Sequence, residues 1–289
     1  MLNGNLKLAV QKKGRLTDKS LQLLRNCGLD IEEYSERLIV TSRNFELDIL
    51  FLRDDDIPEY VQDGVADIGI VGNDIVKEKN VDVKVLRHLG FGKCTLMIAI
   101  PENESIKGIE DLRGKRIATS FPKIVNDFLK ENRIEAKVIE ISGSVEIAPS
   151  LGIADLICDL VSTGNTLKLN KLKKSFTVFS SDAVLIGTDS PQLENDKKEN
   201  LETLLNRIDS VLNARNSKYL MMNVPKDRIS TVTSVIPSLN SPTVVPLADN
   251  KMAAVHAVVT VDTFWKINEK LKSAGASGII LLPIENMIL

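Results

Sequence analysis

The feature that most constrains the fold is a regular alternation between short apolar segments and amphipathic ones. Each amphipathic segment follows a short apolar run, as after "LKLAV" (6–10), "DILFL" (48–52) and "ADIGIVG" (66–72). This alternation is typical of α/β proteins, in which helices cover a largely parallel sheet. Because open parallel sheets bind ligands at the carboxyl ends of their strands, the polar loops after these strands are the first candidates for a site.

The alternation starts again partway along the chain, which predicts a second lobe. After "CTLMIAIP" (94–101), the segment "GKRIATSFPKIVNDFLKENRI" (114–134) repeats the strand-then-helix order. A length of 289 residues, with 43% of them hydrophobic, suits two or three domains with real cores. We expect lobe I over 1–96, completed by about 178–215, and lobe II over 97–177. Strands that cross between two such lobes would leave a cleft.

Residues 218–289 show a different rhythm. Their apolar and amphipathic segments follow the order strand, helix, strand, strand, helix, strand. This βαββαβ order is that of a ferredoxin-like unit. The segment has no evident nucleophile or acid pair, so binding or assembly is its expected role.

Charge and motif content exclude several classes of protein. The net charge of -2 gives no general attraction to nucleic acid or to anionic membranes, and no run of 18 apolar residues occurs. The chain starts without a secretory leader, so we expect a cytoplasmic protein. No P-loop, dinucleotide fingerprint or GxSxG nucleophile elbow occurs. The three cysteines are too widely spaced for a zinc site or a disulfide framework, and we expect them to be buried: Cys27, Cys94 and Cys158.

One stretch, "ADLICDLVSTGNTLKL" (154–169), combines two acids with a hydroxyl-rich loop. In an extended strand Asp155 and Asp159 are four residues apart, so both side chains point to the same face. A carboxylate pair at a strand end can bind sugar hydroxyls or a hydrated magnesium ion. The loop at 162–166 contains a glycine and precedes a helix-like segment, whose free backbone N–H groups could bind an anion. An ordinary turn with threonine helix caps is the commoner explanation on composition alone, and both remain open.

Two further stretches place basic residues after strands. In "QKKGRL" (11–16), Lys13 and Arg15 stand at the end of the first strand, where they could neutralise phosphate oxygens. Arg53 begins "RDDDIP" (53–58). The alternatives are a solvated basic loop for the first stretch and, for the second, a helix start whose aspartates favour the N-terminal dipole.

Taken together, these motifs resemble those of the ATP phosphoribosyltransferase family in order and spacing over nearly the whole chain. The matching catalytic motifs are "QKKGRL", "RDDDIP", "GVADIGIVG", "GKRIATSFP", "GSVEIAP" and "ADLICDLVSTGNTL". In the C-terminal part, "SKYLMMNVP", "SPTVVPLAD" and "GASGIILLPIE" resemble the regulatory domain of the long form of the family. Each motif alone is weak, but nine in register are specific.

The resemblance implies two periplasmic-binding-protein-like (type II) lobes and a ferredoxin-like, ACT-type regulatory domain at 218–289. It implies transfer of the 5-phosphoribosyl group of phosphoribosyl pyrophosphate to N1 of ATP, with release of pyrophosphate, as the first step of histidine biosynthesis. The implied cofactor is Mg²⁺, the implied inhibitor is histidine, and the implied assembly is a homo-oligomer, either a dimer or a hexamer. Because the transition state resembles an oxocarbenium ion, positioning and electrostatics supply most of the catalysis.

The resemblance assigns the phosphoribosyl group to the end of the strand in "ADLICDLVSTGNTL". Asp159, with Asp155, would face the ribose or a magnesium ion shared with the substrate phosphates. The 5-phosphate would bind to the loop residues Ser162, Thr163, Gly164, Asn165 and Thr166.

Other residues match nucleotide, pyrophosphate or inhibitor contacts of the family. Contacts in the nucleotide and pyrophosphate cleft are implied for Lys13, Arg15, Arg53, Asp74 and Glu146. Contacts to inhibitor histidine are implied for Asn223, Thr243, Val258 and Gly278. The alternative for this last set is an ordinary strand or turn role.

Two functions of other classes compete with this one. A cytoplasmic small-molecule sensor could use the same two-lobed cleft without turnover. A catalytically silent regulatory subunit would have lost the hydroxyl-rich loop, and the loop is intact in this sequence.

Overall fold

The computed structural model describes residues 4–32, 37–161, 165–188, 195–237 and 241–289. The chain forms two compact units, one of residues 1–25 with 29–200 and the other of residues 26–28 with 201–289. In the described part of the chain, no helix is both long and apolar enough to cross a membrane.

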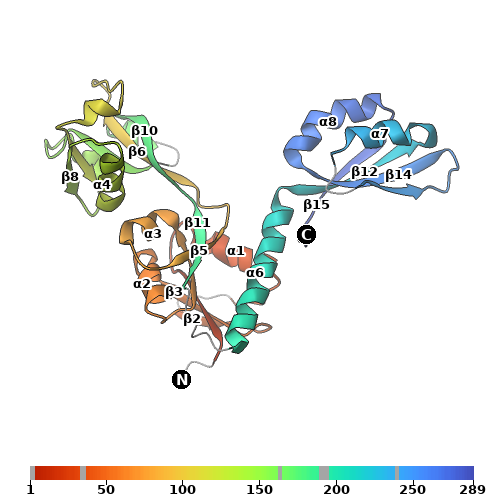
Figure 1. Cartoon of the computed structure of the whole chain (residues 1–289), viewed down its shortest axis with the longest axis horizontal. Helices are drawn as coiled ribbons and strands as arrows, with labels where there is room; N and C mark the ends of the chain where they lie inside the picture. The colour runs from red at the N-terminus through yellow and green to blue at the C-terminus, as the bar shows by residue number, and fades with distance from the viewer. Residues whose placement is uncertain (1–3, 33–36, 162–164, 189–194, 238–240) are drawn as a thin grey trace. The chain divides into compact units, whose positions relative to one another are not determined.

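The larger unit contains two lobes, and lobe I is built on a six-stranded sheet (Figure 1). In spatial order its strands are β2 (Ile39–Thr41), β3 (Leu47–Leu52), β1 (Leu6–Gln11), β4 (Ile68–Gly72), β11 (Ala183–Gly187) and β5 (Lys84–His88). Strand β1 pairs in parallel with β3 and β4, whereas β11 is antiparallel to β4. The lobe's helices are α1 (Thr17–Asn26), α2 (Ile57–Gln62) and α3 (Asn73–Lys79), with the 3-10 turn η1 (Asp54–Asp56) before α2.

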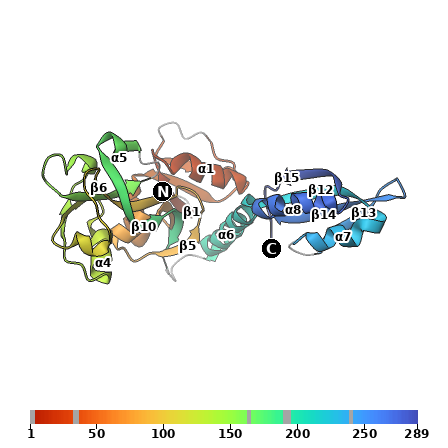
Figure 2. The same ribbon diagram turned by 90° about the horizontal axis from the view of Figure 1, so that it is seen from above.

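Lobe II is built on a five-stranded sheet whose long strand β10 can be followed in Figure 2. In spatial order its strands are β10 (Leu172–Ser181), β6 (Cys94–Pro101), β9 (Leu156–Val161), β7 (Arg116–Thr119) and β8 (Lys137–Glu140). The helices are α4 (Pro122–Glu131) and α5 (Asn165–Leu169), with 3-10 turns η2 (Ile109–Leu112) and η3 (Val145–Ile147). The two faces of β9 bury different cores, because Leu156 and Cys158 face α4 whereas Ile157 and Val161 face η3 and α5.

Two chain segments connect the lobes. One runs from β5 to β6 and the other from β10 to β11, where only Asp182 separates the two strands. Two α/β lobes with crossing strands confirm the expected periplasmic-binding-protein-like arrangement. Most of helix α6 (Asn195–Arg215) differs from expectation, because residues from Leu201 onward belong to the second unit rather than to lobe I. There Ile208 and Val211 are buried, and Ser210 accepts a backbone hydrogen bond from Met287.

The second unit contains an antiparallel sheet in the order β13-β14-β12-β15. Along the chain its elements are β12 (Ser217–Pro225), η4 (Lys226–Arg228), α7 (Ile229–Val235), β13 (Thr243–Pro246), β14 (Met252–Thr260), α8 (Val261–Ser273) and β15 (Ser277–Pro283). This confirms the expected βαββαβ order. Helices α7 and α8 lie on one face of the sheet (Figure 1), where Leu220, Met222, Val255 and Leu271 are buried.

The three cysteines are free and buried, as expected. Burial raises the pKa of the Cys27 thiol to about 11. Thiols in such surroundings stay protonated, which makes them poor nucleophiles.

Candidate functional site

A cavity of about 610 Å³ lies in the larger unit, at the carboxyl ends of parallel strands from both lobes. In lobe I it reaches the ends of β1, β3 and β4, and in lobe II those of β7, β8 and β9. This is where an open α/β sheet is expected to bind its ligand. The lining residues are Gln11, Arg15, Leu16, Asp54, Asp55, Gly72, Asp74, Ile75, Glu78, Lys79, Ser120, Phe121, Pro122, Glu140, Ile141, Ser142 and Leu160.

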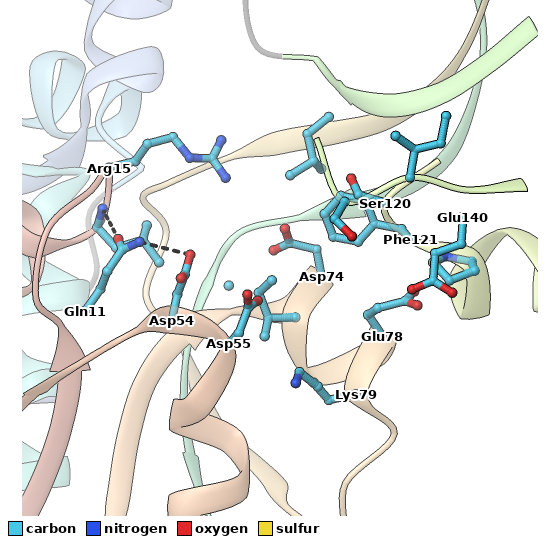
Figure 3. A pocket seen from close by; sticks show the side chains of 17 residues that line it. Gln11, Arg15, Asp54, Asp55, Asp74, Glu78, Lys79, Ser120, Phe121 and Glu140 are labelled. Carbon is cyan, nitrogen blue, oxygen red and sulfur yellow. Dashed lines mark hydrogen bonds between the residues drawn. The ribbon is translucent and has the colours of Figure 1, made fainter. Parts of the chain in front are cut away.

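Acidic side chains outnumber basic ones in this cavity (Figure 3). Its cations are those of Arg15 and Lys79. Burial raises the pKa of Asp55, and the neighbouring charge of Asp54 adds to the rise. A cavity of this charge favours ligand groups that donate hydrogen bonds, such as hydroxyl and amino groups. The lining carboxylates are those of Asp54, Asp55, Asp74, Glu78 and Glu140.

Gln11, which the sequence analysis did not select, forms part of the lobe I wall. Its amide nitrogen donates to Asp54 Oδ2 at 3.0 Å, and its amide oxygen accepts the backbone N–H of Leu16 at 3.2 Å. Gly14 lies so close that a Cβ built on it would be 2.4 Å from Gln11 Nε2. The glycine of "QKKGRL" therefore makes room for the glutamine that opens the same motif. The position of Gln11 at the carboxyl end of β1 was the sequence signal that could have identified it as a candidate site residue.

Of the five predicted cleft residues, only Arg15 and Asp74 line the cavity. In Figure 3 the Arg15 guanidinium and the Asp74 carboxylate both project into it. Lys13 is exposed on the loop before Arg15 and lies outside the cavity lining. Arg53 is also exposed, and its carbonyl oxygen accepts the backbone N–H of Asp56 at the start of η1. The helix-start alternative describes what the structure shows at Arg53.

Asp74 is held by a residue from the segment that connects the lobes. The hydroxyl of Ser181, at the end of β10, donates to Asp74 Oδ1 at 2.7 Å and accepts the backbone N–H of Asp74 at 2.9 Å. Asp74 is 2% exposed and Ser181 is 5% exposed. A Cβ on Gly72 would lie 2.2 Å from Asp74 Oδ1, so glycine is needed where the carboxylate folds back. Sequence reasoning missed Ser181, because it is 107 residues away from Asp74.

The structure brings Asp159 and Glu146 together. Burial raises the pKa of Asp159, and the nearby negative charge of Glu146 adds to the rise, while a backbone hydrogen bond from Leu160 (2.7 Å) opposes it. Both carboxylates are half-buried at the carboxyl end of β9 and in η3. Leu160, the next residue along β9, points to the other face and lines the cavity. The carboxyl end of β9 thus lies between the cavity on one face and the Asp159 and Glu146 carboxylates on the other.

The sequence analysis expected Asp155 beside Asp159 at the carboxyl end of the strand, but the structure places it at the other end. It precedes the first residue of β9, so it is about 13 Å from Asp159 along an extended chain. Its carboxylate accepts the backbone N–H of Arg116 at 2.8 Å and pairs with the Arg116 guanidinium at 2.8 Å. These hydrogen bonds lower the pKa of Asp155. The same-face prediction assumed that both acids belong to the strand, and the position of the strand start could not be read from the apolar run.

The predicted phosphate loop is only partly within the described residues. Ser162, Thr163 and Gly164 lie outside them. Helix α5 spans Asn165–Leu169, so it begins inside the predicted loop 162–166, two residues before the helix that was expected after the loop. Thr166 is exposed, and its carbonyl oxygen accepts the amide of Asn170 at 2.9 Å.

In the second unit, the four residues with implied inhibitor contacts belong to four different strands. Asn223 and Val258 lie on the sheet face opposite α7 and α8, since their neighbours in the strands are the buried ones. Thr243 shares that face because it pairs directly with His256 of β14. Gly278 has φ +54°, and a Cβ there would lie 3.3 Å from Asn223 Nδ2. The same face carries the hydrogen bond between Tyr219 Oη and His256 Nδ1, at 2.8 Å. The sheet therefore gathers residues that are separated in the sequence.

Among the described residues, no three histidine, cysteine, aspartate or glutamate side chains lie close enough to hold a metal ion by themselves. Magnesium sites often need fewer, because Mg²⁺ keeps several waters and is commonly bound by one or two carboxylates together with substrate phosphates. The Asp159 and Glu146 carboxylates fit that kind of site.

Comparisons with known proteins agree with the motifs. The model of the family described as ATP phosphoribosyltransferase matches residues 53–210, and the model of the HisG C-terminal domain matches residues 214–286. A protein of Cytophaga hutchinsonii named ATP phosphoribosyltransferase is 50% identical over 283 residues, covering 98% of each chain. A protein of the same name from Bacteroides thetaiotaomicron is 45% identical over 283 residues, covering 98% of this chain and 99% of that one.

A solved structure shows the same similarity. It is the ATP phosphoribosyl transferase (HisG:HisZ) complex from Thermotoga maritima, and the matched chain is 29% identical with a TM-score of 0.59. The match covers 71% of this chain and 96% of the other.

Proposed function

The chain belongs to the ATP phosphoribosyltransferase family, whose enzymes act in histidine biosynthesis, and we propose how its residues divide the work of phosphoribosyl transfer to ATP. The observation that carries the proposal is the position of β9. Leu160 of this strand faces the acidic cavity, and Asp159 points to the opposite face, the one that packs against helix α5. The proposed nucleotide site and the proposed phosphoribosyl site thus adjoin at the end of β9, where the two substrates can meet.

The nucleotide occupies the 610 Å³ cavity. Its acid-rich wall suits the ribose hydroxyls and the amino group of adenine, which donate hydrogen bonds to carboxylates. Triphosphate oxygens would be repelled there, so they lie towards Arg15, the cation that projects into the cavity (Figure 3). Asp74 is fixed by Ser181 before any ligand arrives, so it can accept a hydrogen bond without reorganisation.

The phosphoribosyl group occupies the other side of β9. The loop 162–166 binds the 5-phosphate through backbone N–H groups near the start of α5, and Asp159 faces the ribose. In its ionised form this carboxylate stabilises positive charge that develops on the ribose ring. Three residues do not enter this proposal, because Asp155 is bound by Arg116, and Lys13 and Arg53 do not line the cavity.

Mg²⁺ would be held by Asp159 and Glu146 together with phosphate oxygens of the bound substrates. When bound, it neutralises the charge of the leaving pyrophosphate. The contribution of the chain is to keep two carboxylates half-buried and near each other; burial, with the charge of Glu146, raises the pKa of Asp159, and a bound cation would stabilise its ionised form.

The second unit serves regulation. Histidine is proposed to bind beside Asn223, Thr243, Val258 and Gly278, in the manner of an ACT-type domain, and to inhibit the reaction. The chain is proposed to act in the cytoplasm as a homo-oligomer.

The test of the function is a turnover assay. Purified protein is mixed with ATP, phosphoribosyl pyrophosphate and Mg²⁺, and both phosphoribosyl-ATP and pyrophosphate are measured. Product in equal amounts is expected, with none when either substrate is left out. Absence of turnover over a range of pH and salt, together with measurable ATP binding, would favour a sensor instead.

A further inference from the structure

Helix α3 carries two acids of the cavity wall, and they contact different parts of the molecule. Asp74, at its start, is bound by Ser181 in the connecting segment. Glu78, one turn later, reaches lobe II, where its two carboxylate oxygens accept the backbone N–H groups of Lys123 at 2.9 Å and Ile124 at 3.0 Å. Both acids line the same cavity (Figure 3).

Glu78, a lobe I residue, accepts hydrogen bonds from the free backbone N–H groups at the start of α4 in lobe II. Helix α4 begins with Pro122, which has no N–H group, so Lys123 and Ile124 supply the first available donors. A carboxylate at this position also benefits from the partial positive charge of the helix N-terminus. A helix start that faces a cavity commonly binds phosphate, but here the protein's own carboxylate occupies it.

Other contacts of α3 reinforce the connection between the lobes. Ile75 packs against the lobe II core that includes Ile124. Lys77 approaches Asp127 of α4 at 4.0 Å, and Lys123 pairs with the same Asp127 at 2.9 Å. Only the Glu78 contact consists of two hydrogen bonds from backbone donors, whose direction is fixed by the helix.

We propose that Glu78 is a positioning residue for the reaction, which holds α4 against α3 and so fixes the Ser120–Pro122 wall opposite Asp74. The inference rests on the proposed function, because it gives Glu78 no contact with the reacting atoms. Two substrates that must meet in one orientation are sensitive to such spacing, and a displacement of about 1 Å can lower a rate roughly 100-fold. The conformation required for transfer is thus assembled by a hydrogen-bonded carboxylate rather than by apolar packing alone.

The experiment compares Glu78→Ala and Glu78→Gln with Glu131→Ala, a control at the exposed C-terminal end of α4. Turnover of ATP and phosphoribosyl pyrophosphate is measured for each. The distance between the lobes is measured by spin labels on Asp63→Cys and Lys130→Cys, two exposed sites, in protein diluted with unlabelled chains. The native cysteines are buried and react slowly with the label.

Glu78→Ala should lower kcat roughly 30-fold or more and broaden or shift the distance distribution before any substrate is added. Glu78→Gln, whose amide keeps one acceptor oxygen, should fall between wild type and Glu78→Ala in both measurements. Glu131→Ala should match wild type.

Two results would overturn the inference. One is unchanged kinetics and distances in Glu78→Ala. The other is an unchanged distance with a raised KM for ATP alone, which would make Glu78 a substrate contact instead. Failure of the proposed function is distinguishable, because wild type itself would then show no turnover while the distance measurement could still respond to Glu78→Ala.

Discussion

The two ends of the central parallel strands use aspartate in opposite ways. Immediately before β4, Asp67 accepts the backbone N–H of Lys7 at 2.7 Å, and immediately before β9, Asp155 accepts that of Arg116 at 2.8 Å. Each pairs with a cation, Asp67 with Lys197 at 3.1 Å and Asp155 with its own Arg116. The amino ends of the two strands are therefore joined to their neighbours by the same arrangement in both lobes.

At the carboxyl ends Asp74 is buried and Asp159 is half-buried, and neither has such a partner among the described residues. Within the described ranges, neither Asp74 nor Asp159 forms an ion pair with lysine or arginine. The pKa of Asp155 is lowered by Arg116, whereas that of Asp159 is raised by burial and by Glu146. Perturbed carboxylates that cost stability are retained where they serve a ligand, so the direction of the pKa shift separates structural from functional acids on one strand.

The largest effect is expected from Asp159→Asn. Loss of the charge that faces the ribose should lower kcat/KM roughly 100-fold or more. The stability of the folded state, by contrast, should not fall in this variant. Because the folded-state pKa of Asp159 is raised, the native state loses stability as pH rises through that pKa, and at neutral pH the ionised group is a cost.

Testing Asp159→Asn therefore requires two measurements, one of activity and one of stability. Steady-state kinetics should show the loss, while thermal unfolding at pH 7 should show a midpoint unchanged or raised by about 2 °C. A variant that is both inactive and clearly less stable would mean that Asp159 is structural, and the contrast with Asp155 would disappear.

A smaller kinetic effect is expected from Arg15→Gln, which lies at the carboxyl ends of the lobe I strands. Without this cation the cavity keeps its carboxylates and repels triphosphate more strongly, so KM for ATP should rise roughly tenfold. The exposed Lys19→Gln on α1 is the matched control, with kinetics close to wild type. If both variants changed KM equally, the effect would be one of net charge rather than of the site.

At the amino end of β4 in lobe I, Asp67→Asn should reduce the stability of the fold without reducing the turnover per folded molecule. The side chains of Asp67 and Lys197 are only 11% and 16% exposed, so removing one charge leaves the other poorly solvated. A loss of about 2 kcal/mol is expected, or roughly 6 °C in the melting midpoint. Calorimetry and kinetics below the transition test this, and a specific loss of kcat would contradict it.

Sequence alone predicted the lobes, the crossing strands and the βαββαβ unit, because alternating apolar and amphipathic segments report burial directly. It did not distinguish Asp155 from Asp159, since both were assigned to one strand, whereas β9 begins at Leu156 and leaves Asp155 outside it. One signal was present in the repeated pattern of "VADIGIV" and "IADLICD", in which the aspartate follows alanine and precedes the strand. Aligning the two lobes internally would have paired Asp155 with Asp67.

The contacts that cross between the lobes left no local signal. Ser181 and Glu78 stand in unremarkable positions, and their partners are 107 and 45 residues away. Periodicity identifies which residues are buried, but it does not say which lobe buries them. The expected extent of lobe I differs from the observed units for the same reason, since the apolar positions of α6 do not say to which unit they belong.

The smallest effect, and the sharpest test of the comparison, is expected from Asp155→Asn. Asparagine keeps one acceptor for the backbone N–H of Arg116 but loses the ion pair with its guanidinium, which is partly exposed. The folded-state pKa of Asp155 is lowered, so its charge stabilises the native state above the unfolded-state pKa, and this contribution is lost as pH falls through the folded value. Melting should therefore fall by roughly 3 °C at pH 7, and the difference from wild type should shrink between about pH 5 and pH 2. Activity should stay within about twofold of wild type, because the strand end that meets the ligands lies about 13 Å away. A difference that persisted at low pH, or a large loss of kcat, would place Asp155 with Asp159 after all.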